Sequence, residues 1–435
     1  MARKQLTLLM LLIAMMVSAQ PIDNDVKYGA EMLKPGTEAP DFNMKTVEGK
    51  SFRLSSLRGK YVVLDFWAAW CPDCRKDMPN MQRIYDQFSR KGVEFVGISF
   101  DTDKEKWQKA VDTYQINYTQ VSELKKMRDT DIAQKYGIRW IPSMYLIGPD
   151  GKVVLATVLS DKLERVLYEQ TAADFRPNKE DVTIGGAKGK LAATIQKPQL
   201  RQGERCPMVM ICHGFTAHKE RKLLTLLADS LQANGIASIR FDFNGHGESE
   251  GDFQEMTVPN EIEDARHVFE YVRDLPYVSG VSIMGHSQGG VVAAMLAGEL
   301  GPDALQAVAL YAPAAVLRDD AIRGTTPGVK PDPKNDPGNP PEYVEIWGGL
   351  KLGRDYVLSA QTLPIYETAR AYRGPALIIH GNADRTVPYT YGMRFNEIWP
   401  GSEYVELEGF DHGFSQNVYR TTDIAVRFFV NTLKH

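Results

Sequence analysis

Neither charge of one sign nor a long hydrophobic run dominates this sequence of 435 residues. Lys and Arg number 51 against 55 Asp and Glu, a formal net charge of −4, and no basic stripe stands out. We therefore expect no nucleic-acid partner, which would require a basic surface. The apolar run at residues 6–17 is shorter than the ~20 residues that span a bilayer.

The first 19 residues have the pattern of a secretory signal peptide. Arg3 and Lys4 give a basic start, residues 6–17 an apolar core, and residues 17–19 a small-residue cleavage site. A single membrane anchor is the alternative, and the shortness of the run disfavours it. No cysteine follows the cleavage site, which argues against a lipid anchor. We expect an exported protein, periplasmic or extracellular, with no stable membrane insertion once the signal is removed.

Cysteine is also scarce, and its four positions form two pairs of different character. Cys206 and Cys212 bound an apolar segment that is typical of a buried strand. Residues so placed on a strand lie about 20 Å apart, beyond the reach of a disulfide, so we expect a structural role. Cys71 and Cys74, by contrast, form a C-x-x-C motif.

The composition, 43% hydrophobic and 24% charged, is that of a soluble globular protein, and the length suggests two or three domains. Apolar strands alternate with helical spacing, which predicts an α/β fold in each half. We expect a first domain over residues 34–170, a linker over 171–180 and a second domain over 181–435. A Pro/Gly/Asp-rich break at residues 323–341 predicts a short inserted cap, about residues 315–365.

The expected strands can be placed from their β-branched and apolar residues. In the first domain they are residues 61–66, 93–100, 143–147 and 153–158, with helices at 74–90, 104–114 and 163–170. In the second domain they are residues 208–212, 237–241, 281–284, 307–311, 376–380 and 403–407. Helical segments separate these later strands, which implies a largely parallel sheet.

A G-x-S-x-G motif, Gly285-His286-Ser287-Gln288-Gly289, lies between an apolar strand and a helical run. This is the context of a nucleophile elbow, in which the glycines permit a tight turn that raises the serine above the sheet. An accidental Gly-rich turn is the alternative, and the flanking elements disfavour it. Ser287 is therefore predicted to be the nucleophile of a serine hydrolase.

A serine hydroxyl needs a base to take its proton, and elimination among the eight histidines favours His412. It follows the last predicted strand and precedes the terminal helix, as the chain order Ser, acid, His requires. Asp384, just beyond the strand at residues 376–380, is the predicted acid that orients the imidazole. Asp411 is the rival, but an adjacent residue rarely reaches the same ring productively.

Acyl transfer also needs N–H donors for the developing oxyanion. The elbow geometry predicts the backbone N–H of Gln288 as one donor. The second is expected from the loop after an early strand, residues 213–216, where we predict the N–H of Phe215. An ordinary strand-end turn is the alternative for this loop.

Segments across the second domain resemble the bacterial cinnamoyl (feruloyl) esterases. They are residues 213–216, 241–249, 285–290 and 363–367, with Gly348-Gly349 in the cap region. The resemblance covers roughly residues 180–435. The elbow and triad are common to the α/β-hydrolase superfamily, whereas the cap match is more specific.

The esterase resemblance implies an α/β-hydrolase fold with a small insertion over the site and a cap tyrosine that contacts the phenolic hydroxyl of the substrate. By its spacing to Leu363, Tyr356 matches that tyrosine. A packing aromatic is the alternative for Tyr356. Residues 330–341 do not align clearly with the family, so no ligand contact is assigned to them.

The C-x-x-C motif comes directly after a predicted strand and opens a helix, in Trp67-Ala68-Ala69-Trp70-Cys71-Pro72-Asp73-Cys74. A thiolate at a helix N-terminus is stabilised by unpaired N–H groups and the helix dipole. Cys71 is therefore predicted to attack a disulfide, and Cys74 to resolve the mixed disulfide. A zinc site is disfavoured because no second C-x-x-C or paired His follows; inert cysteines are the other alternative.

With residues 36–40 and Trp140-Ile141-Pro142, this motif resembles the secreted thioredoxin-like thiol-disulfide oxidoreductases over roughly residues 34–165. The resemblance implies a thioredoxin-like fold and matches Pro142 to the cis-proline that lies beside the disulfide and helps hold a partner chain. The dipeptide Pro72-Asp73 departs from the commoner Gly-Pro, so the redox direction stays open.

The same resemblance matches Asp65 to the buried acid that can assist deprotonation of Cys74. A buried carboxylate has a raised pKa, which suits that role.

These patterns predict a thioredoxin-like domain fused to an α/β-hydrolase, without an implied metal or organic cofactor. The leading function is hydrolysis of small carboxylic esters, with hydroxycinnamoyl esters of plant polysaccharide as the expected substrate class. The second is disulfide reduction or exchange on a protein partner. Two alternatives stay open: a serine peptidase, and a non-enzymatic docking role for the first domain.

Overall fold

The computed structural model of the chain describes residues 24–171, 176–325 and 336–433. The expected signal peptide lies outside these residues, as do parts of the expected linker and cap. The chain divides into two units, residues 1–174 and 175–435, each with its own hydrophobic core. Among the described residues, no helix is long and apolar enough to cross a membrane.

The first unit alternates strands and helices around one mixed sheet. Its elements are α2 (Asn24–Tyr28), β1 (Asn43–Thr46), β2 (Ser51–Arg53), β3 (Val62–Trp67), α3 (Pro72–Phe88), β4 (Glu94–Ser99), α4 (Lys104–Thr113), β5 (Thr119–Ser122), α5 (Asp131–Lys135), β6 (Ser143–Ile147), β7 (Val153–Thr157) and α6 (Ser160–Thr171). The strand order is β2-β1-β5-β4-β3-β6-β7. The pairs β3–β4 and β4–β5 are parallel, and the other pairs are antiparallel.

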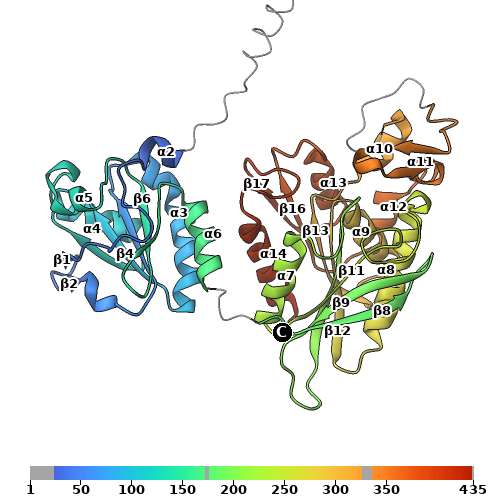
Figure 1. The fold of residues 1–435 in the computed structure, drawn as a ribbon, viewed down its shortest axis with the longest axis horizontal. Helices are drawn as coiled ribbons and strands as arrows, with labels where there is room; N and C mark the ends of the chain where they lie inside the picture. The colour runs from blue at the N-terminus through green and yellow to red at the C-terminus, as the bar shows by residue number, and fades with distance from the viewer. Residues whose placement is uncertain (1–23, 172–175, 326–335, 434–435) are drawn as a thin grey trace, which may run out of the picture. The chain divides into compact units, whose positions relative to one another are not determined.

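Strand β3 is buried along its whole length, as expected for the core strand of a sheet covered on both faces. Helices α3 and α6 lie side by side in this unit (Figure 1). The strand delivers the chain to the redox motif, and α3 starts immediately after it. The local sequence thus places both cysteines at a strand-to-helix junction.

The second unit is built on a larger sheet. Its elements are β8 (Lys179–Gly185), β9 (Lys190–Gln196), β10 (Cys206–Cys212), α7 (Lys222–Ala233), β11 (Ala237–Phe241), α8 (Val258–Arg273), β12 (Val278–His286), α9 (Gln288–Leu300), β13 (Leu305–Tyr311), α10 (Val316–Arg323), β14 (Tyr343–Glu345), β15 (Lys351–Gly353), α11 (Arg354–Gln361), α12 (Ile365–Ala369), β16 (Ala376–Gly381), α13 (Thr390–Ile398), β17 (Glu403–Leu407) and α14 (Val418–Leu433). The strand order is β17-β16-β13-β12-β10-β11-β9-β8.

The pairs from β17 to β11 are parallel, and β9 and β8 add antiparallel strands at one edge. The predicted α/β architecture with a largely parallel sheet is therefore confirmed. In the region where the cap is expected, α10, the β14–β15 hairpin and α11 interrupt the alternation between β13 and β16. Cys206 and Cys212 lie at the two ends of β10 as buried free thiols.

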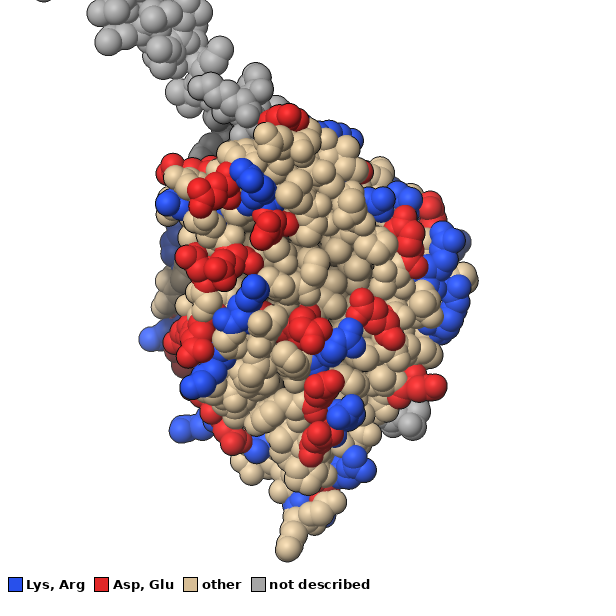
Figure 2. Space-filling view, turned by 90° about the vertical axis from the view of Figure 1, so that its right-hand side faces the viewer, with Lys and Arg blue, Asp and Glu red and all other residues tan. Residues whose placement is uncertain are grey.

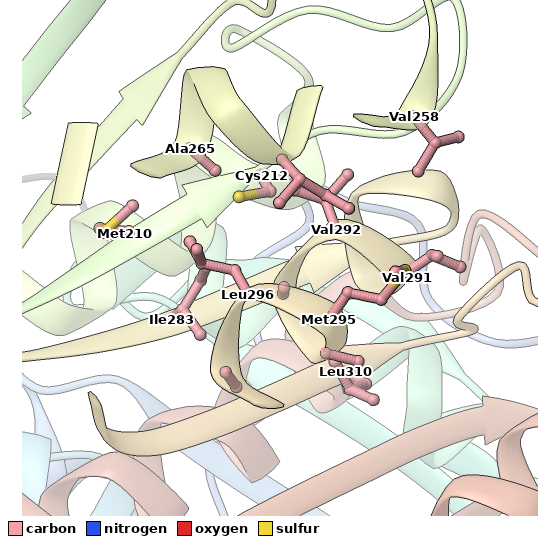
Figure 3. Packing of buried hydrophobic residues seen from close by; sticks show 14 of the residues in the cluster. Met210, Cys212, Val258, Ala265, Ile283, Val291, Val292, Met295, Leu296 and Leu310 are labelled. Atoms are coloured by element: carbon pink, nitrogen blue, oxygen red, sulfur yellow. The ribbon is translucent and has the colours of Figure 1, made fainter. Parts of the chain in front are cut away.

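Helix α9, which follows the nucleophile elbow, is buried on every side over its first three turns. Its sequence explains this, because the apolar residues do not keep to one face. Figure 3 shows Val291, Val292, Met295 and Leu296 of this helix packed among side chains of neighbouring strands and of α8. The elbow therefore rests on a helix that has little freedom to move.

Acidic and basic side chains are interspersed over the face of the molecule that Figure 2 displays. They surround a broad uncharged area, and neither sign forms a continuous stripe on that face. This distribution agrees with the balanced composition of the sequence.

Candidate active sites

Ser287 lies at the turn between β12 and α9. Its φ of 58° and ψ of −122° form the strained conformation of a nucleophile elbow. A Cβ at Gly285 would lie 2.0 Å from the carbonyl oxygen of Gly289, and a Cβ at Gly289 would lie 2.2 Å from that of His213. The two glycines are therefore required for the close backbone approach that raises Ser287 above the sheet.

The three side chains predicted for the triad come together beyond the carboxyl ends of β12, β16 and β17. His412 Nε2 lies 2.9 Å from Ser287 Oγ, and His412 Nδ1 lies 2.7 Å from Asp384 Oδ2. With both ring nitrogens engaged, the imidazole can accept the serine proton while the carboxylate holds the Nδ1–H tautomer.

The environment of Asp384 favours its ionised form. Its Oδ1 accepts the backbone N–H groups of Thr386 and Val387, each at 2.8 Å, and His380 Nε2 lies 3.2 Å from Oδ2. Burial raises the pKa of Asp384, but the hydrogen bonds from His380, His412 and Val387 outweigh it and hold the pKa well below its ordinary value. Sequence reasoning missed this role of His380, which only its position at the end of a strand near the acid could have suggested.

The loop that carries His412 is held by its neighbours. The carboxylate of Asp411, the rival acid, accepts the N–H groups of Gly413 at 3.1 Å and Ser415 at 2.9 Å. His286, the second residue of the elbow motif, has its Nε2 2.9 Å from the carbonyl oxygen of His412. Burial lowers the pKa of His286 to about 3, so the neutral ring donates this bond. Asp411 and His286 thus position the loop, a role that sequence reasoning did not predict.

The backbone donors predicted for the oxyanion lie on two elements that meet at Ser287. A Cβ at Gly214 would lie 2.9 Å from Ser287 Cβ, so the loop after β10 lies directly against the serine. Within the described parts of the chain, neither the N–H of Phe215 nor that of Gln288 has a hydrogen-bond acceptor. Both N–H groups are therefore available to a ligand atom.

His213 sets the direction of the Phe215 N–H. Its Nε2 accepts the N–H of Phe243 at 3.1 Å, so Nδ1 carries the proton and donates to the carbonyl oxygen of Gly214 at 2.8 Å. Burial lowers the pKa of His213 well below its ordinary value, which keeps the ring neutral. Because a trans peptide is planar, the N–H of Phe215 points opposite to that carbonyl.

Tyr356 lies beside these donors and is only 2% exposed. Its hydroxyl donates to Gln288 Oε1 at 2.7 Å, so the hydroxyl predicted to bind substrate already has a partner within the protein. The ring of Phe215 contacts that of Tyr356, with centroids 5.8 Å apart, and that of the half-exposed Trp347, with centroids 5.7 Å apart. Phe215 thus belongs to an aromatic cluster beside the serine loop.

The two cysteines of the C-x-x-C motif lie at the start of α3 as a reduced dithiol. Cys71 is the N-cap residue, and its Sγ accepts the backbone N–H of Cys74 at 3.2 Å. It also lies 3.5 Å from the carbonyl oxygen of Ile141, which precedes the cis peptide bond to Pro142. The structure therefore brings Pro142 next to the dithiol, as the resemblance implies.

The pKa values of the two thiols are shifted in opposite directions. The hydrogen bond from the Cys74 thiol, aided by the backbone N–H of Cys74, outweighs burial and lowers the pKa of Cys71 to about 7. The neighbouring Cys71 sulfur, together with burial, raises the pKa of Cys74. Cys71 is thus the thiol suited to attack near neutral pH.

This difference predicts the pH dependence of thiol alkylation in the reduced protein. The rate at Cys71 is expected to rise with pH through a midpoint near 7, because only the thiolate reacts. Cys74 should stay unmodified over the same range. Mass spectrometry after timed iodoacetamide pulses from pH 5 to 9 measures both rates, and a midpoint above 8 at Cys71 would contradict this assignment.

Asp65 is buried on β3, and its Oδ2 accepts the hydroxyl of Tyr118 at 2.8 Å. Burial raises the pKa of Asp65 to about 7, although the Tyr118 hydroxyl opposes the shift. The carboxyl can therefore exchange a proton near neutral pH. Tyr118 was not identified from the sequence, since nothing in its local pattern links it to β3.

The raised pKa of Asp65 makes the stability of the first unit pH-dependent. Between about pH 4 and 7 the native state holds a proton that the unfolded state has lost, so stability falls as pH rises. The Asp65→Asn side chain does not ionise, so the variant escapes this fall in stability. Relative to the wild type, its free energy of unfolding should be higher by about 2–4 kcal/mol more at pH 8 than at pH 4. Urea unfolding of the reduced chain at both pH values measures it; equal gains would refute the shift.

The first unit is similar to known thiol-disulfide oxidoreductases. Residues 35–156 match the AhpC/TSA family model. Thiol-disulfide oxidoreductase ResA of Bacillus subtilis is 33% identical over 144 residues, which are 33% of this chain and 78% of the relative. ResA of Oceanobacillus iheyensis is 32% identical over 170 residues, which are 38% of this chain and 85% of the relative.

The second unit also has relatives. Residues 203–330 match the family model described as "Serine aminopeptidase, S33". The structure of Est1E from Butyrivibrio proteoclasticus with ferulic acid bound is 30% identical, with a TM-score of 0.55, and the match covers 58% of this chain and 98% of that chain. The predicted order of folds is therefore confirmed. The chain belongs to the ResA-like thiol-disulfide oxidoreductases through its thioredoxin-like first unit, and its second unit is an α/β-hydrolase similar to Est1E.

Proposed function

We propose that the second unit hydrolyses carboxylic esters through an acyl intermediate on Ser287. The observation that carries this proposal is the continuous hydrogen-bonded chain from Ser287 Oγ through His412 to Asp384, at 2.9 and 2.7 Å. The N–H groups of Phe215 and Gln288, which have no acceptor within the part of the chain that the structure describes, lie on the elements next to the serine. This is the set of groups that acyl transfer requires.

In the proposed reaction Ser287 Oγ attacks the ester carbonyl carbon while His412 Nε2 takes the serine proton. The N–H groups of Phe215 and Gln288 stabilise the tetrahedral oxyanion. His412 then returns the proton to the leaving alcohol, which leaves the acyl group on Ser287. Water, deprotonated by His412, attacks the acyl carbonyl and releases the carboxylic acid and free serine.

The proposed substrates are esters of hydroxycinnamic acids. The bound ferulic acid in the similar Est1E structure supports this class. The aromatic rings of Phe215 and Trp347, next to the serine loop, suit a flat aromatic acyl group. The family model for serine aminopeptidases keeps an amide substrate as the competing possibility.

A substrate panel on the full-length chain separates these possibilities. We expect the highest kcat/KM on methyl ferulate and methyl 4-hydroxycinnamate, lower values on p-nitrophenyl acetate, and little release from aminoacyl p-nitroanilides. Preferred cleavage of the anilides would establish a peptidase and refute the proposed ester function.

The first unit supports a second proposed activity, thiol–disulfide exchange on a partner protein. The Cys71 thiolate attacks one sulfur of the partner disulfide, and the other partner sulfur leaves as a thiolate. Cys74, deprotonated with help from Asp65, then attacks Cys71 Sγ. The partner leaves as a dithiol, and a Cys71–Cys74 disulfide forms.

The Cys74→Ala variant should therefore accumulate a mixed disulfide between Cys71 and the partner, because the resolving thiol is missing. Non-reducing electrophoresis detects this species. A docking role for the first unit would produce no mixed disulfide.

We further propose that the protein works outside the cytoplasm. Two points support this location. Residues 1–19 have the pattern of a signal peptide, and a partner protein keeps its disulfide only in oxidising surroundings. Fractionation of cells that express the chain with and without residues 1–19 tests it. Retention of both forms in the cytoplasm would refute it.

A further inference from the structure

Three buried polar side chains from three helices meet behind the nucleophile elbow. Tyr356 of α11 donates its hydroxyl to Gln288 Oε1 at 2.7 Å. Gln288 Nε2 donates to Glu261 Oε2 of α8 at 2.8 Å, and lies 3.6 Å from Met256 Sδ. Glu261, Gln288 and Tyr356 are 1%, 2% and 2% exposed. Each end of the Gln288 amide is thus fixed by a different helix.

The triad chemistry does not explain why a carboxyl group is buried here. None of the ion pairs formed by the described residues includes Glu261, and the groups that face it are Gln288 of α9, Tyr356 of α11, Asp264 of α8 and Cys212 of β10. Burial raises the pKa of Glu261 well above its ordinary value, which disfavours the ionised form. An apolar side chain would be less costly at this position, so the hydrogen bond to Gln288 is what the carboxyl contributes.

Gln288 is also the residue whose backbone N–H is the proposed oxyanion donor. It follows the strained Ser287 and is the first residue of α9, so no intrahelical hydrogen bond fixes its N–H. The carbonyl oxygen of Ser287 shares the planar peptide with that N–H and accepts the N–H groups of Gly290 at 2.9 Å and of Ala314 at 3.0 Å. The side chain of Gln288, held from α8 and α11, adds a second constraint on the same residue.

We propose that Glu261 and Tyr356 are positioning residues for the oxyanion hole, which hold the Gln288 backbone N–H in place through the Gln288 amide. Tyr356 then acts through Gln288, and its hydroxyl does not bind the substrate. Since Tyr356 lies on the cap helix α11, the same contact links the cap to the elbow. This inference rests on the proposed ester hydrolysis.

Tyr356→Phe separates the two roles of this hydroxyl. Assayed on methyl 4-hydroxycinnamate and on methyl cinnamate, which lacks the ring hydroxyl, the variant should lose about tenfold in kcat on both, because oxyanion stabilisation is weakened without being removed. KM should change little on either. Tyr372→Phe is the matched control, since Tyr372 is buried with its hydroxyl on the carbonyl oxygens of Leu305 and Pro375, away from the elbow.

Two results would overturn the inference for Tyr356. A rise in KM confined to the hydroxylated ester would mean that Tyr356 contacts the substrate. An unchanged kcat on both esters would mean that the bond to Gln288 does not position the oxyanion donor.

Substitutions of Glu261 test the other end of the chain of hydrogen bonds. Glu261→Met keeps the volume and removes the acceptor, and should lower kcat about tenfold. Tm should change little, because the loss of a buried carboxyl offsets the lost hydrogen bond of Gln288 Nε2. Glu261→Gln restores an acceptor for Gln288 Nε2 and should recover most of the lost kcat. Glu270→Met, an exposed change on the same helix, is the control. Equal kcat in the Met and Gln variants would contradict a positioning role.

The rate at which a fluorophosphonate modifies Ser287 keeps this test independent of the substrate. Phosphonylation uses the same oxyanion donors and needs no ester turnover. If the wild-type chain hydrolyses no ester, the proposed function fails, while slower phosphonylation of Tyr356→Phe and Glu261→Met would still support the positioning role. Wild-type phosphonylation rates in both variants would overturn it.

Discussion

Ser287→Ala is expected to lower kcat on methyl ferulate by about 10⁴-fold or more, because removal of a triad nucleophile leaves only binding and the oxyanion donors. His412 and Asp384 keep their hydrogen bond at 2.7 Å, but without the serine hydroxyl no acyl intermediate can form. KM should change little, since the hydroxyl contributes mainly to the transition state. Steady-state kinetics of the full-length chain measure both constants.

The matched control is Ser282→Ala, on the same strand β12. The Ser282 hydroxyl is buried and has no hydrogen-bond partner among the described residues, so its loss should leave kcat within about twofold. Substantial esterase activity in Ser287→Ala would mean that another group attacks the ester, and the proposed mechanism would be wrong.

Cys71→Ala is expected to abolish catalysed insulin reduction, a loss of at least about 100-fold. Cys71 carries the thiolate near neutral pH, and the raised pKa of Cys74 makes that thiol a poor substitute. The turbidity of insulin in the presence of dithiothreitol follows the rate.

Cys206→Ala is the control for this substitution, because Cys206 is a buried thiol in the other unit. Ser287→Ala should also leave insulin reduction unchanged. A Cys71→Ala chain that still accelerates insulin reduction would favour a docking role for the first unit.

Much of the fold followed from local pattern. Strands such as β3, β10 and β16 consist largely of apolar and β-branched residues. The expected elements therefore lie within a few residues of the observed ones. The short and half-exposed strands β1 and β2 have no such run, and they form only because tertiary pairing selects them.

The antiparallel edge of the second sheet, β8 and β9, also lacked a local signal. Most of β8 is exposed, so it resembles a polar segment in sequence. Its pairing with β9 over a full register depends on the rest of the sheet being in place.

For the candidate sites, too, local sequence predicted some residues and not others. Ser287, Asp384 and His412 could be predicted because chain order and motif context constrain them. Tyr118 could not, because the fold brings its distant partner Asp65 to it. His380 lies close to Asp384 in sequence, and only its position at the end of a strand near the acid could have suggested the contact. Tyr356 was predicted by resemblance as a substrate contact, and only the three-dimensional arrangement shows its hydroxyl on Gln288.

Intact-mass spectrometry of the full-length chain, mixed with methyl ferulate and quenched in acid, can detect the acyl intermediate on Ser287. We expect one added feruloyl group per chain within milliseconds to seconds, located by peptide mapping at Ser287 and absent from Ser287→Ala. Turnover without any adduct, or an adduct on a different residue, would contradict it.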